Sequence, residues 1–120
     1  KQVNEVITAE EILEFQHLVR RVPVTDHVIE YAVKLVHKTR PGSTHAVKET
    51  GDYLEWGAGP RASQALILAA KCNALLSGKY SPDVEDVKAV ALPVLRHRII
   101  RNFKAEAEGI SVEDIIARLV

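Results

Sequence analysis

The chain has 120 residues, of which 47% are hydrophobic and 27% are charged, a composition typical of one soluble globular domain. Sixteen basic and sixteen acidic side chains cancel, and this balance disfavours a nucleic-acid binder, which normally carries a basic excess. No apolar run approaches the ~20 residues that a membrane-spanning helix needs, so a membrane partner is not expected.

The first half of the chain predicts two helices and a loop. Thr8 and Glu11 match a Thr-x-x-Glu capping box at the start of an apolar, helically spaced segment, which Pro23 should end. Thr25 is placed to cap a second helix with one apolar stripe. Residues 39–52 carry turn signals at both ends and little periodicity, so we expect a long loop that is mobile from Arg40 onward.

The second half predicts a buried central helix and three shorter segments. The central helix should begin at Pro60, and its residues 62–76 are apolar almost all round, which is typical of the middle of a bundle. Gly78 is a plausible stop, and Ser81 is placed as the N-cap of the next helix. Pro93 should kink or break that helix.

A short piece, residues 94–100, follows the proline, and Ser111 should cap a last helix. The pattern contains no convincing strand and no internal repeat. We therefore predict an all-α fold, a small bundle of five or six helices that forms one domain over residues 1–120. The single cysteine, Cys72, is expected to be a buried apolar residue in a reducing compartment, such as the cytoplasm.

The stretch Gly57-Ala58-Gly59-Pro60-Arg61-Ala62 formally matches the dinucleotide fingerprint Gly-x-Gly-x-x-Ala, but the strand and βαβ unit that this fingerprint requires are missing. A Walker A loop is absent too, because the only Gly-Lys pair, Gly78-Lys79, is followed by Tyr80. The stretch can still be interpreted as a simple anion site at the start of a helix. A helix N-terminus favours an anion, and Arg61 in its first turn could hold phosphate oxygens.

The alternative for this stretch is a plain turn before a core helix, with Arg61 solvated or paired with Glu55. Trp56, just before the turn, is expected to pack beneath it. The five histidines have no metal-ligand spacing, and no metal site is predicted. The basic segment 96–104 could be a solvated face, a contact with a neighbouring subunit or core domain, or, less in keeping with the charge balance, a nucleic-acid patch.

Three segments of the sequence resemble a known protein family. Residues 56–99, WGAGPRASQALILAAKCNALLSGKYSPDVEDVKAVALPVLRHRI, are similar to the C-terminal helical lid of MoxR-type AAA+ ATPases, which are related to the magnesium-chelatase ATPase subunits. Residues 7–41 and 102–119 are similar to the same lid. The most specific parts are the Gly-Ala-Gly-Pro-Arg motif and the VLRHRI segment at residues 94–99.

The resemblance implies that Arg61 is the second sensor residue, which reaches the γ-phosphate of ATP, and that Gly57, Gly59 and Pro60 shape its turn. It also implies that ATP and Mg²⁺ are cofactors of the longer parent protein and are not held strongly by this chain alone. Walker A, Walker B, the first sensor and the arginine finger would belong to the missing core. The isolated chain is therefore expected to hydrolyse no ATP.

The implied partners are the AAA+ core of the same polypeptide, neighbouring subunits of a ring, commonly a hexamer, and von Willebrand factor A domain proteins. The implied role is chaperone-like maturation of partner proteins. The chain begins with Lys1 and has no methionine, which fits a piece excised from a longer protein. The alternative is a stand-alone helical protein- or DNA-binding module. A Walker A motif encoded upstream of Lys1 would favour the ATPase lid.

Overall fold

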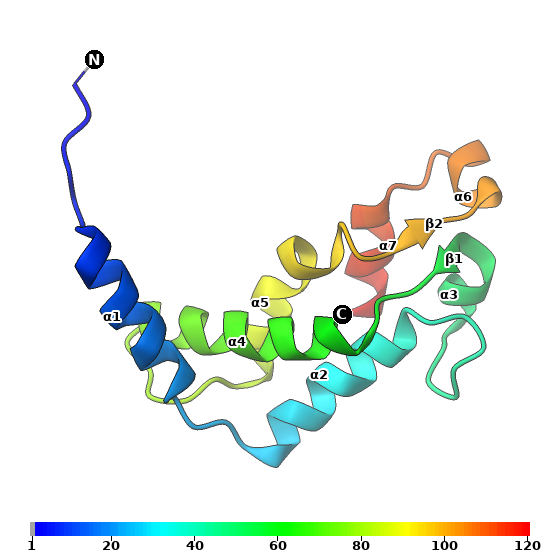
Figure 1. Cartoon of the computed structure of the whole chain (residues 1–120). Coiled ribbons are helices and arrows are strands. Elements are labelled where there is room, and N and C mark those ends of the chain that lie inside the picture. The colour runs from blue at the N-terminus through cyan, green and yellow to red at the C-terminus, as the bar shows by residue number, and fades with distance from the viewer. Residues whose placement is uncertain (1) are drawn as a thin grey trace.

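The computed structural model describes residues 2–120, and within them the chain forms seven helices and one two-stranded sheet. The molecule is flat, measuring 46 × 43 × 19 Å, with α4 across its middle and α1 at one end (Figure 1). The elements in chain order are α1 (Ala9–Arg20), α2 (Asp26–Lys38), α3 (Lys48–Tyr53), β1 (Leu54–Trp56), α4 (Pro60–Leu76), α5 (Val84–Leu95), β2 (Ile100–Arg101), α6 (Phe103–Ala107) and α7 (Val112–Leu119).

The central position predicted for α4 is confirmed, since this helix packs against α5, α2 and α1. Its buried stripe recurs every fourth residue and consists mainly of alanines, which let the neighbouring helices approach closely: Ala62, Leu66, Ala70 and Ala74. The helix is not covered all round, however. Leu76 is 73% exposed at its end, and Cys72 is only half-buried. A chain this flat has too little core to cover every apolar residue of its central helix.

Local signals placed most helix ends correctly. The capping box of Thr8 with Glu11 is present, with both bonds at 3.1 Å, and Ser111 caps α7 through a second box. Pro60 occupies the first position of α4, and Gly78 follows that helix with a φ of +79°. Thr25 is the N-cap of α2, but its side chain makes no capping bond.

Two expectations about α5 are wrong. Asp83, not Ser81, is its N-cap and forms a capping box with Asp86. The Ser81 hydroxyl instead donates to the carbonyl of Pro23, 58 residues earlier in the chain. The expected break at Pro93 does not occur either, because the helix continues to Leu95, whereas the alternative of a kink stays a prediction. The proline lies in the last turn. Its missing N–H removes one hydrogen bond of the helix, and only two helical residues follow it.

The all-α class is confirmed, but residues 2–120 form seven helices rather than five or six, because the short helices α3 and α6 were not predicted, and these residues also form a small sheet where no strand was expected. The predicted loop contains α3, whose Thr50 is fully buried, so only residues 40–47 keep the loop character, and their mobility stays a prediction. The β1 and β2 strands pair antiparallel through Leu54 with Arg101 and through Trp56 with Ile100. Strands of two or three residues that pair across more than forty positions leave no periodic signal in the sequence.

Trp56 does not pack beneath the turn, as the sequence suggested. It is 64% exposed, whereas Leu54, two residues earlier on the same strand, is 3% exposed. The strand pairing is irregular between these two residues, and such a bulge redirects the side chain that follows it. In the part of the chain that the structure describes, no helix has the length and apolarity that crossing a bilayer requires.

Candidate functional site

The turn that leads into α4 is packed against the end of α2. A Cβ atom on Gly57 would lie 2.3 Å from the carbonyl oxygen of Thr39 and 2.6 Å from Cα of Arg40. Both obstacles are backbone atoms, so a side chain here would force the two segments apart. Ala58, the next residue, is 1% exposed. The structure therefore requires glycine at position 57 because of a close backbone approach.

Thr39 holds this turn through its hydroxyl group. The backbone N–H of Ala58 donates to Thr39 Oγ1 at 2.9 Å, and the hydroxyl in turn donates to the carbonyl of Val36 at 2.6 Å. The side chain of Thr39 is fully buried. Sequence reasoning missed this residue because Thr39 lies in a predicted loop and its partner is 19 positions away. A threonine at a helix C-cap, ahead of a Pro-Gly turn, was the only local signal.

Gly59 and Pro60 form the exposed start of α4. Gly59 is the N-cap, with φ −90° and ψ −176°, and no side chain caps this end of the helix. A Cβ atom on Gly59 would meet nothing within 4 Å, so packing does not require glycine there. The absence of a capping side chain leaves the positive end of a 17-residue helix open to an outside anion.

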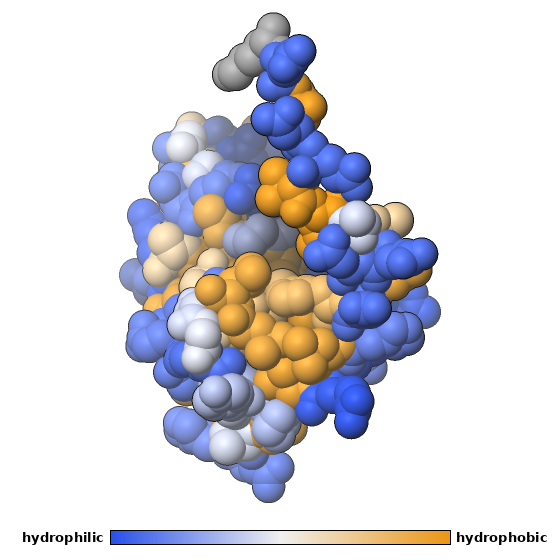
Figure 2. Space-filling view, turned by 90° about the vertical axis from the view of Figure 1, so that its left-hand side faces the viewer, coloured by the Kyte–Doolittle hydropathy of each residue, from blue (hydrophilic) through white to orange (hydrophobic). Residues whose placement is uncertain are grey.

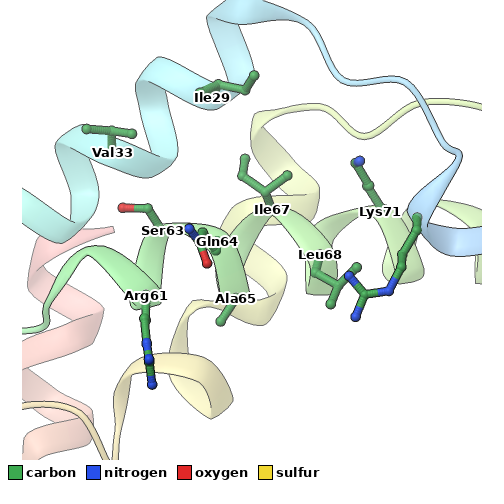
Figure 3. A pocket seen from close by; sticks show the side chains of 10 residues that line it. Ile29, Val33, Arg61, Ser63, Gln64, Ala65, Ile67, Leu68 and Lys71 are labelled. Carbon is green, nitrogen blue, oxygen red and sulfur yellow. The ribbon is translucent and has the colours of Figure 1, made fainter. Parts of the chain in front are cut away.

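Arg61 extends from this helix start into solvent. Its side chain is exposed, and none of the ion pairs and side-chain hydrogen bonds found among residues 2–120 involves it. The alternative pairing with Glu55 is not formed in the described chain. Arg61 points away from α2, the side on which Ile29 and Val33 lie, whereas Ile67 points toward it (Figure 3). The guanidinium is therefore available to a group outside this chain.

An open groove begins beside Arg61 and runs along α4. A cavity of about 710 Å³ adjoins a second one of about 460 Å³, and both are lined by Arg20, Ala65 and Leu68. Ionised side chains of one sign line these cavities, namely Arg20, Arg61 and Lys71, and no carboxylate lines either of them. The remaining lining is mostly apolar and comes from α1, α2 and α4: Phe15, Val19, Ile29, Val33, Ala65, Ile67, Leu68, Ala69 and Cys72.

The face that carries α1 is also unusually apolar. Figure 2 shows an apolar area on this face that is ringed by hydrophilic residues and hollowed near its upper part. On α1 itself, Leu13 is 57% exposed and Leu18 is 51% exposed, and Val19 is the one buried residue of this helix. Exposed apolar area of this extent, next to a groove lined by cations, is typical of a surface that another protein part covers.

The other candidate groups give weaker signals. Within residues 2–120, no cluster of three or more His, Cys, Asp or Glu could hold a metal ion. In the basic segment 96–104, Arg98 donates to the carbonyl of Val94, and Arg101 donates to the carbonyl of Ile110 and lies 4.0 Å from Glu106. These two arginines are therefore bonded within the fold, and a contact of the basic segment with a neighbouring subunit or core domain stays a prediction.

Comparison with known proteins gives consistent results. Residues 48–119 match the model of the AAA lid domain family. The chain is 30% identical over 119 residues to Chaperone MoxR1 of Mycobacterium tuberculosis and 31% identical over 118 residues to the uncharacterized protein YeaC of Bacillus subtilis. These alignments cover 99% and 98% of this chain but only 32% and 34% of the two relatives.

A crystal structure of a candidate ATPase from Cytophaga hutchinsonii superposes with a TM-score of 0.87 at 33% sequence identity. The match covers 98% of this chain and 36% of that one. The chain thus spans about a third of the length of the proteins that it matches.

Proposed function

Because the chain belongs to the AAA lid domain family and is a lid of the MoxR type of AAA+ ATPase, we propose that it closes over ATP and contacts the γ-phosphate through Arg61. One observation carries this proposal. Arg61 lies at the open N-terminus of α4, exposed and with no acidic partner among residues 2–120. A cation at the positive end of a helix is disfavoured unless an anion neutralises it.

The chemistry of this surface suits a polyphosphate. A guanidinium can bind two phosphate oxygens at once, and the uncapped N–H groups of α4 add donors at the same helix end. Arg20 and Lys71 extend the positive potential along the groove. Covering the apolar lining would remove water from the site and strengthen each of these interactions.

The remaining catalytic groups would have to come from elsewhere. Phosphoryl transfer requires a bound Mg²⁺ ion, a phosphate-binding lysine and a positioned water. The 120 residues contain no Walker A motif, so the nucleotide and Mg²⁺ that the family implies would be held mainly by another part of the parent protein. The role of this chain would be to bring Arg61 to the γ-phosphate when the lid closes.

The proposed partners follow from the same surface and from the family. We propose that the AAA+ core of the same polypeptide covers the groove beside Arg61. AAA+ proteins usually assemble into rings, and we propose a cytoplasmic ring, commonly a hexamer, in which neighbouring subunits contact the lid. Movement of the lid during hydrolysis would drive remodelling or maturation of partner proteins, with von Willebrand factor A domain proteins as the candidate class.

The proposal is tested on the parent ATPase. Arg61→Ala should lower kcat roughly a hundredfold, as expected for removal of one charge-stabilising donor, with ATP affinity close to that of the wild type. Arg61→Lys keeps the charge but not the bidentate geometry and should recover only part of the rate. Lys34→Ala, which removes an exposed cation from α2, is the matched control and should leave kcat unchanged. An unchanged kcat in Arg61→Ala would refute the sensor role.

A further inference from the structure

We propose that Thr39 is the positioning residue of this site, and that it fixes Arg61 by anchoring the turn before α4 to the end of α2. This inference rests on the proposed function of Arg61. Thr39 would contact neither ATP nor the reacting atoms. It would act only through the turn that carries the arginine.

The anchor consists of one hydrogen-bond chain and one close backbone contact. The N–H of Ala58 donates to the Thr39 hydroxyl, and that hydroxyl donates to the carbonyl of Val36 in the last turn of α2. Beside these bonds, the backbone at Gly57 lies directly against the Thr39 carbonyl, with no room for a Cβ atom. The turn is therefore held in both distance and orientation relative to α2.

Arg61 lies three residues beyond Ala58, so a displacement of the turn would also displace the backbone that carries the guanidinium. Between them, Gly59 is held by one backbone bond, which its carbonyl accepts from the Ala62 N–H at 3.0 Å. The Gly59 cap makes no side-chain bond, and the surroundings of Gly59 are open. A displacement of about 1 Å at a catalytic contact is enough to reduce a rate strongly. Through Thr39, the end of α2 would thus help to position Arg61, although α2 itself would not contact ATP.

The test compares two buried threonines in the parent ATPase. Thr39→Val removes the hydroxyl at nearly constant volume and leaves the Ala58 N–H unpaired, which should lower kcat about tenfold. Thr39→Ser keeps both hydrogen bonds and should retain most of the rate. Thr50→Val is the matched control. Thr50 is equally buried and donates to the Lys38 carbonyl at the same helix end, but no hydrogen bond joins it to the turn.

A double-variant cycle separates positioning from general damage to the fold. If Thr39 acts through Arg61, Thr39→Val should have no further effect on kcat in an Arg61→Ala background. An equal fold-loss with and without Arg61 would overturn the proposal, as would an equal loss in Thr50→Val. A loss of rate in Arg61→Ala together with full activity in Thr39→Val would refute the role of Thr39 and leave the sensor role intact.

A measurement on the unmodified protein covers the case in which Thr39→Val fails to fold. Hydrogen exchange of the Ala58 amide in the full parent protein should be as slow as that of the α2 amides, because the anchor has to open before exchange occurs. Fast exchange at Ala58 would overturn the proposal. This result does not depend on whether Arg61 touches ATP.

Discussion

Replacing Asp86 should destabilise the junction between α4 and α5 more than replacing any exposed acid nearby. The Asp86 side chain is 4% exposed and accepts three hydrogen bonds. Asn73 Nδ2 donates to Oδ1 at 2.9 Å, the Asp83 N–H donates to Oδ2 at 2.9 Å, and Lys79 Nζ lies 2.6 Å from Oδ2. The carboxylate therefore joins the last turns of α4 to the first turn of α5.

The magnitude follows from which donors lose their partner. In Asp86→Ala, Lys79 keeps Asp83 at 3.0 Å and access to water, so its share of the loss is small. The Asn73 amide and the Asp83 N–H lose a charged acceptor, and a cavity remains where the carboxylate was buried. Loss of two bonds to a charged acceptor corresponds to about 3–6 kcal/mol of unfolding free energy. Asp86→Asn keeps one acceptor oxygen and should cost about half as much.

Urea unfolding at pH 7, followed by far-UV circular dichroism, measures these differences. Glu85→Ala is the control, because Glu85 is an exposed acid of the same helix turn whose ion pair with Lys88 spans 3.4 Å at the surface. This control should change the unfolding free energy by less than about 0.5 kcal/mol. A loss in Asp86→Ala no larger than that of the control would show that the buried carboxylate contributes nothing net, and the argument would be refuted.

Three further predictions concern pH, Trp56 and catalysis. Burial raises the pKa of the Asp86 carboxyl, but the hydrogen bonds from Lys79 and its other donors outweigh burial, so the pKa lies below the ordinary 3.8. A carboxyl group whose pKa is lowered by folding stabilises the folded state above its ordinary pKa, and this contribution is lost as the pH falls through the folded pKa. In an acid titration the free energy of unfolding should therefore decrease below about pH 4, and Asp86→Asn, which has no carboxyl group at this position, should lack that part of the decrease. Trp56→Ser should change the unfolding free energy by less than about 1 kcal/mol, because the indole is 64% exposed; a cost of several kcal/mol would show that the ring is a packing anchor after all. The purified 120-residue chain should release no phosphate from ATP above the no-protein rate, and turnover that disappears in Arg61→Ala would contradict the need for a separate core.

The features that could be predicted from the sequence are those set by neighbouring residues. The capping box of Thr8, the start of α4 at Pro60 and the stop at Gly78 each depend on a few adjacent positions. The exposure of Trp56 depends instead on pairing with a strand far along the chain. The role of Ser81 likewise depends on a carbonyl 58 residues away. Tertiary contacts of this kind leave no trace in local spacing.

In the candidate site too, a residue with a local signal could be predicted from the sequence, whereas Thr39, which acts through a tertiary contact, could not. Arg61 could be found from sequence because a cation in the first turn of a helix conflicts with the helix dipole, and such a conflict is itself a signal. Thr39 breaks no local rule, since a buried threonine at a helix C-cap satisfies its own hydroxyl within its own turn. Its link to Ala58 exists only once α2 and α4 are packed together. The site thus contains Arg61, which is unfavourable in its local surroundings, and Thr39, which we propose holds it in place. Only Arg61 can be identified without knowledge of the fold.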